Sequence, residues 1–125
     1  MKYEEFAKHV QSFAQLDSID EAQKGISATL STLAERIDAE LANKLAAQLP
    51  IEISSYLQKE QKEKGTLFSL QEFYQRVIDK EKIDSAQAVE QVRAVFAVIS
   101  SAVNPNDLNM VKISLSQDYE ELFAV

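Results

Sequence analysis

Apolar residues recur every three or four positions along most of the chain, which is the spacing of one face of an α-helix. In the first such stretch Tyr3, Phe6, Val10 and Phe13 fall within about one third of the helical circumference, the width of a face that packs on a core. Similar stretches continue to the end, and they predict about eight helices that begin near Tyr3, Ser18, Asp38, Pro50, Ser69, Asp84, Asn104 and Ser116. Only two glycines and two prolines interrupt them, too few turn residues for a β-sandwich or barrel. The predicted fold class is therefore all-α.

Local signals mark where several of these helices begin. Ser69 followed by Glu72 is a capping-box pattern, and Phe68 and Phe73 stand at the positions of a hydrophobic staple around it. The same box spacing occurs at two other helix starts, Ser18 with Glu21 and Asp84 with Gln87. The helix that follows position 84 is apolar over more than half its circumference, so we expect it to be the most buried element.

An internal repeat relates the two halves of the chain. Residues 6–10 align with 73–77 at an offset of 67, and a glutamate precedes both segments. Farther on the offset becomes 66 and apolar positions match at helical spacing, with Ala22, Ile26, Leu30, Leu33 and Ile37 corresponding to Ala88, Val92, Phe96, Ile99 and Val103. We therefore predict a single domain over residues 1–125, a helical bundle of two pseudo-repeated four-helix units at 1–64 and 65–125. Convergence of amphipathic helices is the alternative origin of the pattern.

Both glycines fall at positions that invite an explanation. We place the linker between the units at residues 59–66, and Gly65 follows the polar run 59–64 within it. We expect Gly65 to adopt the left-handed conformation that ends many helices. A short hinge of this kind permits exchange of helices between chains, so a homo-oligomer stays open. Gly25 lies inside a predicted helix, where glycine costs about 1 kcal/mol relative to alanine. Close approach of another helix is the expected reason, with a shallow groove for a partner as the alternative.

Charge and composition exclude several classes of function. The formal net charge is −7 at pH 7, which disfavours the phosphate contacts that dominate nucleic-acid binding. No stretch reaches the length of about eighteen apolar residues that a membrane-spanning helix needs, and the acidic start does not resemble a secretory signal. The chain has no cysteine, which excludes disulfides and thiolate ligands and fits a reducing compartment. We expect a cytoplasmic protein that neither binds nucleic acid nor inserts into a membrane.

The residues that could carry chemistry do not form a convergent set. The only histidine is His9, four residues after Glu5, a spacing that could supply two metal ligands on one helix face. Two ligands do not make a site, and the equivalent pair in the second unit, Glu72 and Arg76, is an ordinary ion pair. No glycine-rich phosphate loop or nucleophile elbow occurs. We therefore expect no catalytic, cofactor-binding or metal-binding residues, no cofactor, and a protein that is not an enzyme.

By elimination, the leading functional prediction is a non-enzymatic module for protein–protein interaction or assembly, with a protein partner that the sequence does not identify. The candidate interaction surface consists of four aromatic residues, Tyr56, Tyr74, Tyr119 and Phe123. The acidic and aromatic end of the chain, residues 118–125, could dock into another protein, but its alignment with residues 53–57 favours packing within the chain. The alternative function is a carrier of a small apolar ligand held between the two helical units.

Four segments carry a family resemblance: Tyr3-Glu4-Glu5-Phe6, Ala46-Ala47-Gln48-Leu49-Pro50, Phe73 with Arg76-Val77, and Leu115 with Tyr119-Glu120-Glu121-Leu122-Phe123. Together they resemble an uncharacterised bacterial family, domain of unknown function 2267, over almost the whole chain. The family's second unit usually reads Leu-Pro before its last helix, where this chain has Leu115-Ser116. The resemblance implies a bacterial, all-helical domain of two units, and it brings no catalytic residues with it.

Overall fold

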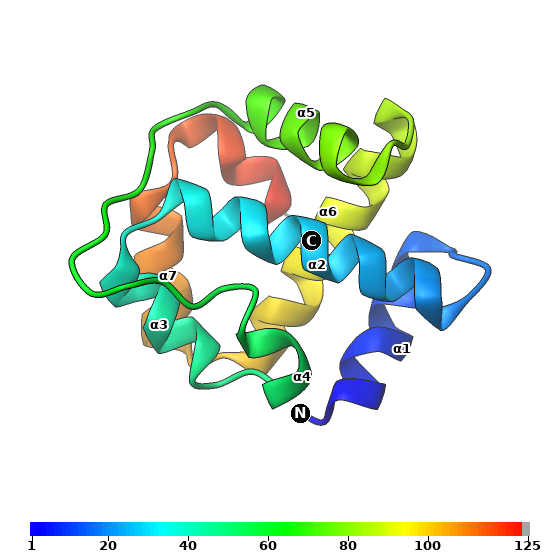
Figure 1. Ribbon diagram of the computed structural model, residues 1–125, viewed down its shortest axis with the longest axis horizontal. Helices are drawn as coiled ribbons and strands as arrows, with labels where there is room; N and C mark the ends of the chain where they lie inside the picture. Colours follow the sequence, from blue (N-terminus) through cyan, green and yellow to red (C-terminus); the bar gives the residue numbers. More distant parts are fainter. Residues whose placement is uncertain (124–125) are drawn as a thin grey trace.

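The computed structural model describes residues 1–123, and in that range the chain forms seven α-helices, one 3-10 helix and no strand. In order they are α1 (Tyr3–Ala14), α2 (Ile19–Arg36), α3 (Ala39–Ala46), α4 (Ile51–Ser54), α5 (Leu70–Glu81), α6 (Ser85–Ala102), α7 (Pro105–Ser114) and η1 (Gln117–Leu122) (Figure 1). The prediction of an all-α fold is confirmed for these residues. The two shortest elements are α4, with four residues, and η1, whose 3-10 geometry is common in pieces of this length.

Side chains cap the helices at the positions that the sequence signals mark. At α5 the backbone N–H of Glu72 donates to Ser69 Oγ at 3.1 Å. At α6 the capping box is complete, because the Gln87 N–H donates to Asp84 Oδ1 at 2.8 Å and the Asp84 N–H donates to Gln87 Oε1 at 3.3 Å. Each such bond satisfies a donor that the first helical turn would otherwise leave free. The local sequence therefore fixes where these helices begin.

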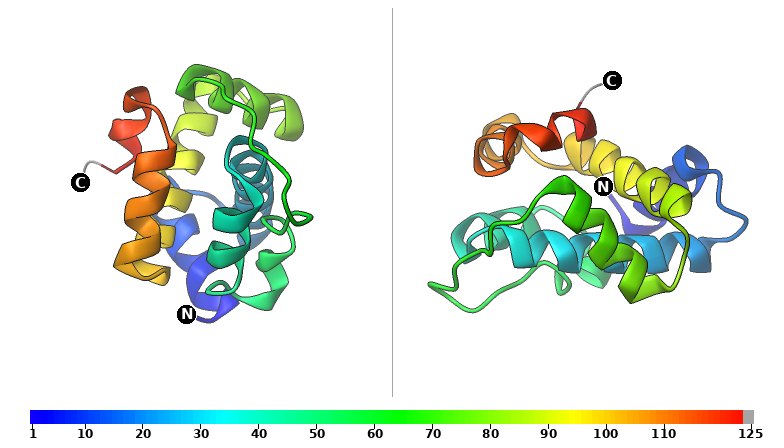
Figure 2. Two further views of the ribbon diagram at one scale, coloured as in Figure 1. Left: turned by 90° about the vertical axis from the view of Figure 1, so that its left-hand side faces the viewer. Right: turned by 90° about the horizontal axis from the view of Figure 1, so that it is seen from above.

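Two long helices, α2 and α6, cross at the centre of the molecule and have eighteen residues each (Figure 1). α5 packs against both of them along the top of that view, and α1 packs against both at the lower right. α3 and α7 contact each other at one end, and η1 lies against α6 (Figure 2). Helices from the two halves of the chain are thus interleaved, since α1 contacts α6 and α5 contacts α2.

The buried apolar side chains form one continuous cluster, to which α1, α2, α3, α5, α6 and η1 all contribute. The expectation that α6 is the most buried element is wrong, because α2 buries ten residues and α6 eight. α2 packs against α1, α3, α5 and α6, and it therefore buries polar residues, Thr29, Thr32 and Arg36, that an apolar pattern does not count. In the described part of the chain, no helix combines the length and the apolar character that crossing a membrane requires.

The segment between α4 and α5 has little helical structure but is held to the turn between α2 and α3. The backbone N–H of Thr66 donates to Glu35 O at 2.8 Å, and the Gly65 N–H donates to Asp38 Oδ1 at 2.7 Å. Farther back, Lys59 Nζ donates to Ile37 O at 2.8 Å. The predicted linker is therefore fastened at several points along its length.

Gly65 serves a different purpose from the one expected. Both glycines have negative φ, so the left-handed conformation predicted for Gly65 is wrong. A Cβ at this position would lie 2.3 Å from the backbone oxygen of Arg36, much closer than any real contact. The absence of a side chain lets the linker approach the end of α2, where Thr66 makes its hydrogen bond.

Phe13 was expected in the core-facing stripe of the first helix, but 59% of its surface is exposed. Phe6 and Val10, on the same helix, are fully buried. Ala14, the next residue and the last of α1, is 3% exposed, so the buried face of the helix continues past position 13 and Phe13 lies outside that face. The apolar stripe of α1 is therefore wider than the face that the core covers, and Phe13 lies at its exposed edge.

Candidate functional site

Of the four predicted interaction residues, Tyr119 is 1% exposed and belongs to the core. Its hydroxyl donates to Phe68 O at 2.8 Å, and its ring meets that of Phe73 edge to face with centroids 6.0 Å apart. Burial raises the pKa of the Tyr119 hydroxyl to about 12. Tyr119 thus attaches η1 to the start of α5 and offers no ring surface to a partner.

Tyr74 on α5 is half-buried and also makes an internal contact. Its hydroxyl donates to Glu121 Oε2 at 3.1 Å, and Arg93 Nη2 donates to the same oxygen at 2.7 Å. Burial, followed by the bond to Glu121, raises the pKa of Tyr74 to about 12, while the bond from Arg93 lowers the pKa of Glu121. The three side chains connect α5, α6 and η1 at the protein surface.

Arg36, at the end of α2, is buried and forms no ion pair with any of residues 1–123. Its Nε donates to Phe68 O at 3.0 Å, its Nη1 donates to Ser114 O at 3.2 Å, and its guanidinium carbon lies 5.3 Å from the centroid of the Tyr119 ring. Carbonyl dipoles and an aromatic face thus replace a carboxylate partner. Arg36 joins α2 to the linker, α7 and η1, and it is a structural residue.

An apolar depression of about 590 Å³ opens where α6, the end of α1 and the end of η1 meet. We call it the aromatic hollow; it is lined by Phe13, Arg93, Ala97, Ser100, Ser101, Glu121, Leu122 and Phe123. Phe13 provides its most exposed large apolar side chain, and His9 stacks on that ring with centroids 6.1 Å apart. The pair Arg93 and Glu121 adds one charge of each sign.

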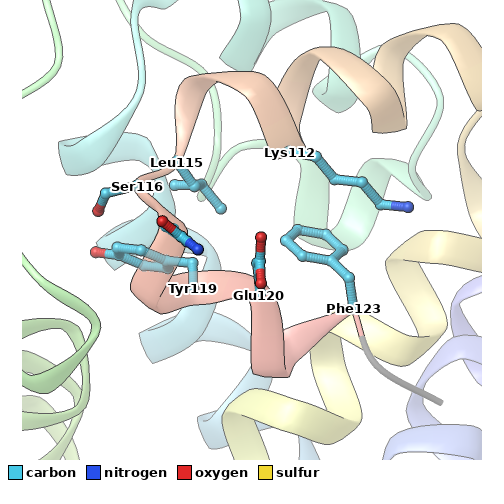
Figure 3. A pocket seen from close by; sticks show the side chains of 7 residues that line it. Lys112, Leu115, Ser116, Tyr119, Glu120 and Phe123 are labelled. Atoms are coloured by element: carbon cyan, nitrogen blue, oxygen red, sulfur yellow. The ribbon is translucent and has the colours of Figure 1, made fainter.

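Phe123, the fourth predicted residue, lines the aromatic hollow and also a second depression of about 620 Å³ between α7 and η1. Figure 3 shows this second depression, in which the Phe123 ring lies next to the Lys112 side chain. The Lys112 ammonium is 5.4 Å from the ring centroid, within reach of a cation–π contact. Phe123 therefore presents ring surface to two adjoining hollows.

A third depression, of about 580 Å³, is chemically different. We call it the polar pocket; it lies between α2 and the end of α5 and is lined by Gln23, Lys24, Ser27, Ala28, Ser31, Tyr56, Lys80 and Glu81. It contains Tyr56, the remaining predicted aromatic, which is half-buried there. The four predicted residues are thus not brought together, since Tyr56 lies in this pocket and the other three lie near η1.

Sequence reasoning missed Glu81, whose carboxyl group faces Gln91 of α6. With the Gln91 amide nitrogen turned toward the carboxylate, it donates to Oε2 at 2.5 Å and to Oε1 at 3.1 Å. Burial raises the pKa of Glu81 to about 7, against smaller lowering effects of Gln91 and Lys24. The only sequence signal was indirect: Gly25, whose missing side chain makes room for Gln91. Close approach of another helix, the expected reason for this glycine, is confirmed.

In residues 1–123, His9 does not belong to a group of side chains that could bind a metal ion. Among residues 1–123, no three or more His, Asp or Glu side chains are grouped so that they could hold a metal ion. His9 contacts the ring of Phe13, on the same helix. The residues that stand out chemically are the lysines, serines and glutamate of the polar pocket and the aromatic side chains of the aromatic hollow.

Comparison with known proteins gives a family and no activity. The model of a family described as an uncharacterized conserved protein (DUF2267) matches residues 3–122, nearly the whole chain. No curated protein matches the sequence. The matched range includes every residue of the polar pocket and all but Phe123 of the aromatic hollow.

Proposed function

The chain belongs to the uncharacterized conserved family DUF2267, and we propose that it acts as a non-enzymatic protein-interaction module that binds its partner through the aromatic hollow. The observation that carries the proposal is the exposure of Phe13. A phenylalanine with 59% of its surface in water, beside a concave apolar surface, is the arrangement of an interface anchor. Leu122 and Phe123 extend the apolar surface on the other side of the hollow.

The charge of the chain indicates the chemistry of the partner. At a net charge of −7, a second copy of this chain is repelled and a basic partner is attracted over a distance of about one Debye length. Apolar anchoring in the hollow together with this attraction favours a partner segment that combines an apolar side chain with Lys or Arg. We therefore assign the hollow to a basic, apolar segment of a different protein.

The proposal also covers location and evolutionary origin. The lack of cysteine supports a place in the reducing bacterial cytoplasm.

Equal helix lengths support a chain built from two related units: α1 and α5 have twelve residues each, and α2 and α6 have eighteen each. In both halves two shorter elements follow the long helix. Duplication of a four-helix unit explains these matches and the offset of 66 or 67 residues between the halves.

The contacts at the centre of the molecule weigh against a carrier that holds a small apolar ligand between the units. Where α2 and α6 cross, the space beside Gly25 is filled by the side chain of Gln91. The polar pocket does lie between residues of the two halves, but its lining includes two lysines and a glutamate. An apolar ligand would have to remove these charged groups from water, at considerable cost.

Photo-crosslinking inside the native host tests the proposal. A photoreactive phenylalanine analogue is placed at position 13, and a matched control carries it at position 67, where Leu67 is 83% exposed but does not line the hollow. We expect one protein with a basic segment to be crosslinked from position 13 and not from position 67. Crosslinks that do not differ between the two positions, or that join two copies of this chain, would overturn the proposal.

A further inference from the structure

The polar pocket carries an excess of positive charge on a protein that is acidic overall. Lys24 forms no ion pair with any of residues 1–123, and Lys80 shares Glu35 with Arg76. Glu35 therefore forms ion pairs with two cations, Arg76 and Lys80. Within residues 1–123, the positive charge of Lys24 is opposed only by Glu81. A small anion that entered the pocket would find two ammonium groups on opposite elements, α2 and α5.

Lys80 is held in place before any ligand arrives. Its Nζ donates to Thr32 Oγ1 at 2.8 Å, to Ser31 Oγ at 3.1 Å and to Glu35 Oε2 at 3.2 Å. These three bonds use all three N–H groups of the ammonium, so Lys80 attracts an anion by its charge and donates to one only by exchanging one of these partners. The pocket thus contains a positioned cation, and the Ser27 side chain adds a hydroxyl that can donate.

Glu81 cancels this positive charge in only part of the molecules near pH 7, and in fewer as the pH falls. Burial raises its pKa to about 7, so a large fraction of the molecules carry a neutral carboxyl group there. Lys24 from α2 and Gln91 from α6 are the groups that face it, and both favour the ionised form without overcoming the effect of burial. A neutral Glu81 does not repel an anion, and it can donate a hydrogen bond to one.

The rest of the lining is apolar enough to hold more than an inorganic ion. Ala28 and the half-buried ring of Tyr56 form part of the wall. We propose that the polar pocket binds a small organic carboxylate, with its charge toward Lys24 and Lys80 and its apolar body against Tyr56 and Ala28. This site is separate from the aromatic hollow, with which it shares no lining residue.

A titration of the ¹⁵N-labelled protein with benzoate, followed by NMR at about pH 6, tests this inference. We expect saturable shifts confined to amides of residues 23–31, 56 and 80–81, with a dissociation constant of about 1 mM or lower. The Lys24→Gln variant should bind about tenfold more weakly, because it lacks one of the two cations. The matched control Lys44→Gln, which removes an exposed lysine outside the pocket, should bind as the wild type does.

Two further arms separate the possible outcomes. Inorganic phosphate is titrated in parallel, and a response to phosphate alone would overturn the assignment to an organic carboxylate. Benzoate binding should weaken about threefold between about pH 6 and about pH 8.5 as Glu81 ionises, and the Glu81→Gln variant should lose this dependence. The absence of saturable shifts at millimolar benzoate, or equal binding by the wild type and Lys24→Gln, would overturn the inference altogether.

Discussion

The Cα of Gly25 on α2 faces the side-chain amide of Gln91 on α6, and a Cβ at position 25 would lie 2.9 Å from that amide. The two residues are 66 positions apart, the offset that relates the two halves of the chain. Gln91 is 4% exposed and its amide reaches Glu81 at the end of α5. One small residue on α2 thus allows a polar contact between α5 and α6.

Gly25→Ala should show opposite effects in two backgrounds. In the wild type the new methyl group displaces the Gln91 amide from Glu81, which outweighs the better helix propensity and lowers the free energy of unfolding by about 1 kcal/mol. In a Gln91→Ala background the clash is gone, and the same substitution should raise stability by about 1 kcal/mol. Urea denaturation of the four proteins measures the cycle, and the same sign in both backgrounds would contradict the proposed contact.

The fold could be predicted from the sequence wherever neighbours in the chain determine it. The staple at the start of α5 is an example, since Phe68 and Phe73 are five residues apart and their rings lie 6.3 Å from each other. The contact between Gly65 and Arg36 could not be predicted in this way, because the two residues are far apart in the sequence and meet only in the folded chain. Backbone oxygens at positions 68 and 114 take the place of an ionic partner for Arg36, and no local pattern encodes them.

The candidate sites were less predictable than the fold. A helical stripe shows which face of α1 is apolar, but it does not show how wide a part of that face the core covers, and Phe13 lies outside that part. Glu81 looked like any surface acid, since the burial that raises its pKa comes from packing of α5 against α2 and α6. For Tyr119 the alignment of residues 118–125 with residues 53–57 already favoured packing within the chain, and the structure places its ring in the core.

Removal of the Arg36 guanidinium should weaken the link between α2, the linker and α7. Arg36→Met keeps the length of the side chain but leaves the carbonyls of Phe68 and Ser114 without this donor, so we expect a loss of about 2–3 kcal/mol. The control Arg93→Met removes a side chain that is 55% exposed and should change stability by less than about 0.5 kcal/mol. Thermal unfolding followed by circular dichroism compares them. Equal losses would show that Arg36 has no special structural role.

Two buried threonines on α2 should respond in opposite ways to replacement by valine. Thr29 Oγ1 is buried and has no hydrogen-bond partner among residues 1–123, so Thr29→Val should raise the free energy of unfolding by about 1 kcal/mol. Thr32 Oγ1 donates to Ala28 O at 2.7 Å and accepts from Lys80 Nζ at 2.8 Å. Thr32→Val should therefore cost about 1–2 kcal/mol. Chemical denaturation measures the free energy of unfolding of both variants. A destabilised Thr29→Val would be evidence that the Thr29 hydroxyl makes a hydrogen bond in the folded protein.

Glu81 should make stability fall as the pH rises. Its pKa is higher in the folded protein, about 7, than the ordinary value of 4.5, so the folded state binds the proton more tightly than the unfolded state. Its contribution to stability is complete below about pH 4.5 and is lost as the pH rises to about 7. The stability of the wild type relative to Glu81→Gln should decrease over this window. A constant difference would mean that the folded-state pKa is not raised.

The most direct test of the interaction proposal is the dissociation constant for the partner that is crosslinked at position 13. Phe13→Ser should weaken binding by about tenfold or more, with the melting temperature nearly unchanged, because an exposed side chain contributes little to the core. Met110→Ser is the matched control, since Met110 is 48% exposed and lies outside the aromatic hollow. The account predicts full affinity for Met110→Ser and loss for Phe13→Ser. Equal affinity of both variants and the wild type would contradict it.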